Sequence, residues 1–412
     1  MSAAPPTNNE NRRRETMESA GTILERKLIA RIHREGPLTF RSFMQSALYD
    51  PEHGYYNTES LKIGPAGDYY TSSNVHAAFG AVLARVFVGL FNELDKNSDH
   101  LALAEMGAGT GQLAVDILNA IRDEHRTLFD RLSYVIVETS PAMRCRQQQR
   151  LVGFTDRVQW QTLAELARSP VTRIVFSNEL VDALPVHRVR KWRGRLEESY
   201  VTVPGTPADG CEVTAEQLTS FEGSSPSIDG PGHLSFAWGD PSTSRFDEYL
   251  TRSRVTLVDG QIAEIGLDVV DWLAEVSRAI ENGFLVTIDY GDEAGLLYGP
   301  DRRKGTLRSF QDHALRESIL ERVGEQDLTA SVNFTALIEY GSDCGLETVS
   351  YERQATFLIR NGLIDRIAAI ETSSGGAIDD LEERLAVKNL FVPGGVSDNF
   401  RVLIQRKRRT SG

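Results

Sequence analysis

The chain has 412 residues, with 45 Lys and Arg against 58 Asp and Glu, and a formal net charge of −13. This acidic balance lacks the positive face that nucleic-acid binding requires, so we expect no nucleic acid as a partner. The 3 cysteines have no Cys-x-x-Cys spacing, which argues against a disulfide framework or a structural zinc and predicts a reducing compartment, most simply a bacterial cytoplasm.

The first quarter of the chain predicts a polar tail followed by helices. Residues 1–20 are polar enough to be disordered, and residues 21–98 predict a helical extension. The longest apolar stretch, Ala77–Phe91, is too short to cross a membrane and contains Arg85, so we expect no membrane insertion. The helices expected in the extension are Ile23–His33, Arg41–Tyr49 and Val75 to about Leu94.

Residues 99–187 alternate between strands and helices, which predicts a parallel sheet with helices on both faces. The expected elements are the strands Leu101–Met106, Tyr134–Glu138 and Ile174–Asn178 and the helices Gln112–Glu124 and Ala142–Val152. The pattern resumes over residues 266–412 with the helices Leu267–Glu281 and Thr356–Arg366 and the strands Phe284–Tyr290 and Phe400–Gln405. We therefore expect an α/β, Rossmann-like core that is divided into two parts.

Residues 188–265 separate the two parts and follow a different pattern. A hairpin is predicted from Val186–Trp192 and Leu196–Val203 across Gly194, and a Gly-, Ser- and Pro-rich run extends from Pro204 to Pro241. A loop of that length inside a compact domain usually belongs to a functional insertion or lid. We expect an inserted cap subdomain here.

The glycine-rich turn that starts at Glu105 follows a predicted strand and opens a predicted helix. Its glycines permit a tight turn and close approach of a ligand, and the helix N-terminus offers free N–H groups. The G-x-G-x-G spacing differs from the G-x-G-x-x-G of dinucleotide sites, and it is typical of S-adenosylmethionine binding. A turn without a ligand is the alternative interpretation. The residues predicted to contact the donor are Glu105, Gly107, Ala108, Gly109 and Gly111.

Glu138 closes the next predicted strand. An acidic side chain at this point can accept both ribose hydroxyls of a nucleoside, which makes Glu138 a candidate donor-binding residue. A carboxylate that faces solvent at a strand end is the alternative.

Asn178 and Glu179 follow the third predicted strand, where ligands of open parallel sheets bind. Methyl transfer needs a group that holds the nucleophile and accepts its proton, and these side chains are placed to do so. Asp182 lies one helical turn further on and is a third catalytic candidate. It is equally explained as a carboxylate that stabilises the start of the following helix.

Two other features carry less information. The loop Gly67–Ser73 precedes a helix, so its polar residues are explained as helix caps. The 8 histidines are scattered without His-x-x-x-His spacing, and we expect no metal site.

Further motifs occur in order along nearly the whole chain. They include Pro37–Phe40, Asp50-Pro51, Gly54–Tyr56, Phe79-Gly80, Glu138–Ser140, Asp182–Val186, Asp289–Gly291, Gly305–Arg308 and Gln326–Phe334. Together with the glycine turn, they make the chain resemble the MidA-like protein arginine methyltransferases, the family of the mitochondrial complex I assembly methyltransferase and its bacterial homologues.

The resemblance implies a class I S-adenosylmethionine-dependent methyltransferase fold and N-methylation of an arginine in a protein substrate. It implies that the extension contributes to the pocket, with donor contacts at Asp68, Thr71 and Ser72 and substrate contacts at Tyr69, His313, Asp327 and Thr329. Asn333 stands where relatives usually have an aspartate, so specificity is expected to differ if that side chain touches the substrate. The run Pro204–Pro241 also matches poorly.

Within this expectation Glu179, together with Asp182, orients the acceptor guanidinium and takes up its proton, and Asn178 positions it. The alternatives are a small-molecule methyltransferase and a non-catalytic assembly factor of a respiratory complex that binds S-adenosylmethionine. A dinucleotide oxidoreductase is disfavoured by the glycine spacing. The sequence leaves a homodimer open.

Overall fold

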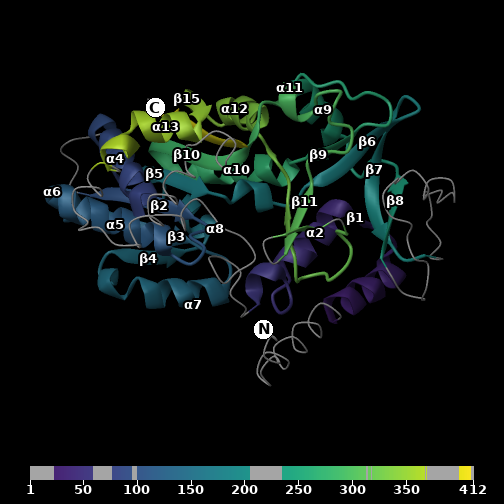
Figure 1. Cartoon of the computed structure of the whole chain (residues 1–412), viewed down its shortest axis with the longest axis horizontal. Helices are drawn as coiled ribbons and strands as arrows, with labels where there is room; N and C mark the ends of the chain where they lie inside the picture. The colour runs from purple at the N-terminus through teal and green to yellow at the C-terminus, as the bar shows by residue number, and fades with distance from the viewer. Residues whose placement is uncertain are drawn as a thin grey trace, which may run out of the picture.

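The structure is a computed structural model that describes residues 23–58, 77–94, 100–204, 234–311, 314–316, 318–366, 368 and 399–409. Two lobes lie side by side along the long axis of the molecule (Figure 1). One lobe contains a large sheet with helices on both faces, and the other is built around a smaller antiparallel sheet. The tail 1–20, predicted to be disordered, lies outside the described residues.

The large sheet has 8 strands in the order β15-β16-β10-β5-β2-β3-β4, with β14 paired to β10. Neighbours from β4 to β10 are parallel, while β16 runs antiparallel to both β10 and β15. The strands are β2 (Leu101–Met106), β3 (Leu132–Val137), β4 (Val158–Gln161), β5 (Val171–Asn178), β10 (Ile280–Asp292), β14 (Val332–Asn333), β15 (Leu346–Arg353) and β16 (Phe400–Lys407).

The first five core strands in chain order stand as 3-2-1-4-5, which is the order of doubly wound nucleotide-binding sheets. The direction of winding reverses between β2 and β5. In such sheets the ligand crevice lies at this reversal, outside the carboxyl ends of the strands. The predicted Rossmann-like fold is confirmed. A ligand site is therefore expected at the carboxyl ends of β2 and β5.

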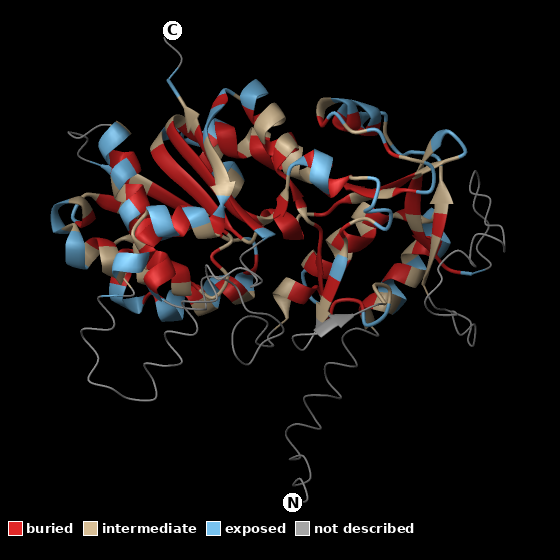
Figure 2. Ribbon diagram, turned by 45° about the horizontal axis from the view of Figure 1, so that its top comes forward, coloured by how far each residue is buried: buried red, intermediate tan, exposed pale blue. Residues whose placement is uncertain are grey.

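Helices cover both faces of the large sheet because the side chains of its strands alternate between two apolar cores. In β5, Ile174 and Phe176 belong to one core and Val175 to the other. The first face is covered by α4 (Ala77–Leu94), α5 (Gln112–Glu124) and α13 (Gln354–Arg360), and the second by α8 (Leu163–Arg168), α10 (Leu267–Ala279) and α12 (Phe334–Asp343). Figure 2 shows the strands buried and the exposed residues on the outer sides of the helices.

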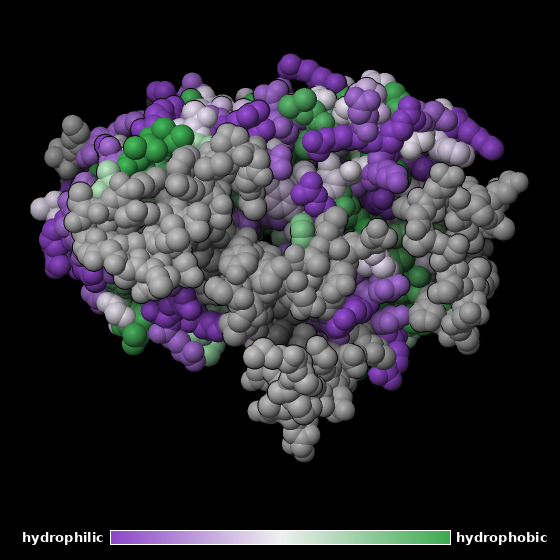
Figure 3. Space-filling view, in the orientation of Figure 1, coloured by the Kyte–Doolittle hydropathy of each residue, from purple (hydrophilic) through white to green (hydrophobic). Residues whose placement is uncertain are grey.

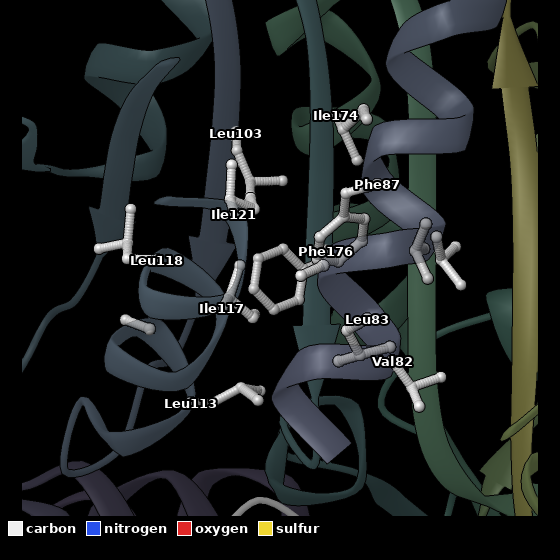
Figure 4. Packing of buried hydrophobic residues seen from close by; sticks show 14 of the residues in the cluster. Val82, Leu83, Phe87, Leu103, Leu113, Ile117, Leu118, Ile121, Ile174 and Phe176 are labelled. Atoms are coloured by element: carbon white, nitrogen blue, oxygen red, sulfur yellow. The ribbon is translucent and has the colours of Figure 1, made fainter. Parts of the chain in front are cut away.

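Phe176 is central to the first core. Its ring centroid lies 4.8 Å from that of Phe87 in α4, and Ile117 of α5 belongs to the same cluster on the other side of the ring (Figure 4). The stretch was expected to be too short to cross a membrane, but by length and composition α4 is long and apolar enough, and 61% of it is buried inside the fold. On the described part of the face in Figure 3, hydrophobic residues form small separate groups on a largely hydrophilic surface.

Gly80 sets the distance between α4 and α5. A Cβ atom at Gly80 would lie 2.5 Å from the Asp116 Cβ, whereas one at Gly89 of the same helix would meet nothing within 4 Å. We expect Gly80→Ala to lower the free energy of unfolding by about 1–3 kcal/mol through overpacking. Gly89→Ala is expected to raise it by roughly 0.5–1 kcal/mol, since Ala is the better helix former. Denaturant unfolding of both variants measures these changes, and equal changes in the free energy of unfolding would contradict the prediction.

The second lobe has a 5-stranded antiparallel sheet in the order β1-β7-β6-β9, with β8 paired to β7. The predicted hairpin is its centre, and the turn between β6 and β7 contains Arg193 and Gly194, both at positive φ as a two-residue hairpin turn requires. The strands are β1 (Leu38–Thr39), β6 (His187–Trp192), β7 (Arg195–Thr202), β8 (Ser235–Gly239) and β9 (Ile262–Ile265).

The N-terminal segment divides between the lobes. The helix over residues 23–35 and α2 (Phe40–Tyr49) pack on the antiparallel sheet, in a core that also includes Val201, Val323 and Leu328. α4 packs on the large sheet instead, because apolar residues occupy most of its circumference. The last 147 residues, expected to complete the large sheet, also supply a 3-stranded sheet of β11 (Arg308–Gln311), β12 (Ala314–Arg316) and β13 (Asp327–Thr329).

Candidate functional site

The glycine turn connects β2 to α5 at the reversal point of the sheet. Gly107, Gly109 and Gly111 have φ values of 67°, 51° and 81°, so all three adopt the left-handed conformation that other residues rarely enter. Gly111 is the N-cap of α5, and the Gly107 N–H donates to the Val137 carbonyl of β3 at 3.0 Å. Left-handed glycines at a helix N-terminus expose backbone N–H groups to a ligand, as the sequence pattern predicts.

Glu105 lies beneath the turn. Its side chain is 2% exposed and accepts a hydrogen bond of 2.6 Å from the Tyr134 hydroxyl. Burial raises the pKa of Glu105 to about 7, and the Tyr134 hydrogen bond opposes this only in part. The predicted donor contact of Glu105 thus falls on a buried carboxyl group whose hydrogen bond joins β2 to β3.

This buried carboxyl group predicts a pH dependence of stability. Because the folded pKa of Glu105 lies above its ordinary value of 4.5, Glu105 stabilises the fold fully below that value, and the contribution disappears as the pH rises through about 7. Glu105→Gln keeps an acceptor for Tyr134 but cannot ionise. We expect its free energy of unfolding, measured by denaturant titration, to fall less than that of the wild type between these pH values; parallel curves would contradict this.

Glu138 follows β3, and its carboxylate is half-buried. Oε1 accepts from the Ser140 N–H at 2.8 Å, and Oε2 accepts from the Gln147 side chain at 2.9 Å. Burial raises the pKa of Glu138, and these hydrogen bonds lower it. A hydrogen bond from the Thr139 backbone also lowers this pKa, so three of the roughly four lone-pair directions of the carboxylate are in use and one is left to accept from a ribose.

Asn178 and Glu179 lie at the end of β5, next to the glycine turn's own strand. The Asn178 amide donates to Glu179 Oε1 at 3.3 Å, while Asn178 Oδ1 is buried and has no hydrogen-bond partner among the residues that the structure describes. Glu179 has a φ of 53°, a conformation that is uncommon for residues other than glycine. Strained backbone of this kind persists where surrounding structure enforces it and clusters at functional sites.

Asp289, at the end of β10, enforces that turn. Its Oδ2 accepts from the three consecutive N–H groups of residues 180–182 at 3.2, 2.8 and 3.3 Å, and Oδ1 accepts from the Tyr290 N–H at 2.9 Å. Burial, and secondly the charge of Glu179, raise the pKa of Asp289 to about 7. The sequence placed Asp289 in a family motif but gave it no role in the site, although it lies near the end of a strand, the same signal that identified Glu179.

Asp182 and Asp327 form an acidic cluster with Asp289. Asp182 lies in the short 3-10 helix η3 (Val181–Ala183) and is 6% exposed; burial, then the charges of Asp289 and Asp327, raise its pKa well above the ordinary value. The Tyr290 hydroxyl acts on Asp182 as a hydrogen-bond partner, which lowers this pKa in part, and Thr329 acts in the same way on Tyr290. The charges acting on Asp182 are therefore negative, and a cationic group would be attracted to this cluster.

The N-terminal segment reaches the same region through the short helix η1 (Tyr55–Asn57). The Tyr56 hydroxyl donates to Asp327 at 2.8 Å, and the Tyr56 carbonyl accepts from the Ser140 hydroxyl at 3.0 Å. Tyr56 thus joins the acidic cluster to the loop after Glu138. The other predicted contacts in this segment, Asp68, Tyr69, Thr71 and Ser72, lie outside the described residues, as does His313.

Asn333 has a structural role. Its Oδ1 accepts from the Ala336 N–H as the N-cap of α12, and its amide donates to the Tyr249 hydroxyl at 3.1 Å and to Ser253 at 3.0 Å. The side chain is fully engaged with protein groups and buried. The structure shows the Asn333 side chain bonded to other protein groups, so it gives no support to the expectation that Asn333 alters substrate specificity.

The described residues contain no group of three or more His, Cys, Asp or Glu side chains arranged to hold a metal ion. They do fit a nucleoside-bearing donor. A left-handed glycine turn at a helix N-terminus stands at the switch point of the sheet, and an oriented carboxylate follows the adjacent strand.

Comparison with known proteins agrees with an S-adenosylmethionine-dependent methyltransferase. Residues 82–352 match the model of a family described as "Putative S-adenosyl-L-methionine-dependent methyltransferase". The mitochondrial protein arginine methyltransferase NDUFAF7 of Xenopus tropicalis is 25% identical over 77% of this chain and 70% of its own, and the human protein is 26% identical over 86% and 77%.

A crystal structure of a Burkholderia thailandensis protein bound to S-adenosyl-homocysteine superimposes with a TM-score of 0.81 at 25% identity. The match covers 98% of this chain and 95% of that one. The likeness therefore includes both lobes.

Proposed function

Because the chain belongs to this family of S-adenosyl-L-methionine-dependent methyltransferases, we propose that its acceptor is an arginine side chain of a protein. The observation that carries the proposal is the acidic environment beyond the glycine turn, where Glu179 adjoins the buried carboxyl groups of Asp289 and Asp182. A guanidinium is cationic at all ordinary pH values, so it matches such a cluster. The names of the relatives, protein arginine methyltransferases, support the same acceptor.

When bound, S-adenosylmethionine supplies an electrophilic methyl group. We assign donor binding to Gly107, Ala108, Gly109 and Gly111 and to Glu138, and the resemblance adds Asp68, Thr71 and Ser72. The Gly107 and Gly111 N–H groups donate to the Val137 and Ala108 carbonyls. In this proposal the N–H groups between them hold the polar end of the donor, the absence of side chains at the glycines allows its close approach, and Glu138 accepts its ribose hydroxyls.

Glu179 performs the acid–base work in this proposal. A guanidinium must lose a proton as its nitrogen is methylated, because its pKa lies above ~12. A carboxylate in contact with the fork orients it, raises the electron density on the attacking nitrogen and accepts the proton. Asn178 holds the Glu179 carboxylate in place at 3.3 Å.

The acidic cluster completes the acceptor site. Asp182 and Asp327 favour the entry of a cation, and Thr329 offers a hydroxyl at its edge. Entry of a guanidinium lowers the pKa of Asp182, so acceptor binding and proton release are coupled at this residue. The resemblance adds Tyr69 and His313 to the acceptor side.

The experiment that tests this function is transfer of a labelled methyl group from S-adenosylmethionine into extract from cells that lack the gene. We expect label in protein and, after acid hydrolysis, in methylarginine. Label confined to small molecules would assign a different acceptor. Donor binding without any labelled product would identify a non-catalytic binding protein.

A further inference from the structure

We propose that Gln147 is a positioning residue for the methyl donor, which fixes the Glu138 carboxylate and the glycine turn relative to one another. Gln147 lies on α7 (Pro141–Arg150), an otherwise polar helix, yet its side chain is 0% exposed. A fully buried glutamine is unusual unless its amide is satisfied by specific partners.

The partners of Gln147 come from the glycine turn, from Glu138 and from the strand β4. Its Nε2 donates to the carbonyl of Gly109, the middle glycine of the turn, and to Glu138 Oε2, both at 2.9 Å. Its Oε1 accepts from the indole N–H of Trp160, on β4, at 3.0 Å. Both amide N–H groups and the amide oxygen are therefore engaged.

This arrangement allows only one orientation of the amide. The Trp160 indole is a donor only, so the amide oxygen must face it, and the two N–H groups must face Gly109 and Glu138. Neither a carboxylate nor an apolar side chain can replace an amide here. A glutamate would place negative charge against Glu138 and the Gly109 carbonyl.

Gln147 also sets how closely α7 approaches the turn. A Cβ atom at Gly111 would lie 3.4 Å from the Cα and Cγ of Gln147, so the glycine and the glutamine pack in direct contact. With the Ser140 N–H holding Glu138 Oε1 and Gln147 holding Oε2, the carboxylate is fixed in rotation.

Replacing Gln147 is therefore expected to affect donor binding and not the methyl-transfer step. Because Gln147 contacts the donor-binding parts and none of the residues 178–182, it acts on donor affinity rather than on methyl transfer. A Gln147→Met variant preserves the shape and removes all three hydrogen bonds. Hydrogen bonds to charged groups contribute enough for us to expect S-adenosylhomocysteine to bind about 10–100-fold more weakly.

The test is calorimetric titration of S-adenosylhomocysteine into the full-length variant, with Gln149→Met as the matched control. Gln149 lies on the same helix but is exposed, so its replacement is expected to leave the affinity unchanged. In kinetics, the KM for the donor rises for Gln147→Met while kcat at saturating donor stays constant. Wild-type affinity, or a fall in kcat with unchanged KM, would overturn the proposal.

Two further variants separate positioning from a general loss of folding. Trp160→Phe leaves Gln147 in place and frees its amide to turn, so a smaller loss of affinity is expected without loss of the folded state. In a Glu138→Ala background, Gln147→Met should weaken donor binding little further, because its main effect passes through Glu138. If the two substitutions each weaken donor binding by the same factor alone and together, Gln147 does not act through the Glu138 carboxylate.

Discussion

Glu179→Gln is expected to abolish methyl transfer while the protein keeps its fold and its affinity for S-adenosylmethionine. The amide is isosteric and can accept from Asn178 as the carboxylate does, but it cannot take up the proton that the acceptor nitrogen loses. Loss of a general base lowers kcat by about 10²–10⁴-fold. Release of S-adenosylhomocysteine in the presence of extract, together with donor calorimetry, measures both quantities.

Glu293→Gln is the matched control for this prediction, because Glu293 is exposed and follows the neighbouring strand β10. Its turnover should equal that of the wild type. Unimpaired methyl transfer by Glu179→Gln would remove Glu179 from the mechanism and leave Asp182 as the candidate carboxylate.

The second large effect is expected at Asp289, which organises the turn that carries Glu179. Asp289→Ala leaves the buried N–H groups of residues 180–182 and of Tyr290 without their acceptor. Each unsatisfied group costs about 1–3 kcal/mol. We therefore expect a loss of several kcal/mol in the free energy of unfolding and a loss of turnover, because the left-handed conformation of Glu179 is no longer enforced.

Asp289→Asn should be the milder change. One amide oxygen can still accept from residues 180–182, but the amide N–H₂ then faces the Tyr290 N–H. Asp271→Ala, which breaks an exposed ion pair with Arg245, is the control and should change stability by under about 1 kcal/mol. If Asp289→Ala unfolds at the denaturant concentration of the wild type, Asp289 does not hold this turn.

Much of the fold could be predicted because the central strands are short apolar runs. Those at Leu101, Tyr134, Ile174 and Phe284 have the composition of strands buried on both faces. The edge strands β4 and β15 were missed for the opposite reason. Their sequences, VQWQ and LETVSYER, mix polar and apolar residues because one side of each remains open to solvent.

The residues of the site also fall into those that the sequence predicts and those that it does not. Glycine spacing and the ends of strands pointed to the turn and to Glu179, since both are local properties of the sequence. Gln147 carries no such signal, because it stands in the polar run Gln147–Arg150 and only packing against β4 and the turn buries it. The bridge from Tyr56 to Asp327 joins residues 271 positions apart, and no local pattern predicts it.

The central claim is that this methyltransferase modifies arginine in a protein, with Glu179 as the base. The most direct measurement compares, by mass spectrometry, the proteins of cells that express the wild type, Glu179→Gln or neither. We predict at least one arginine that is methylated only in the presence of the wild type. The claim is contradicted if no arginine differs among the three, or if the same arginine is methylated in cells that express Glu179→Gln.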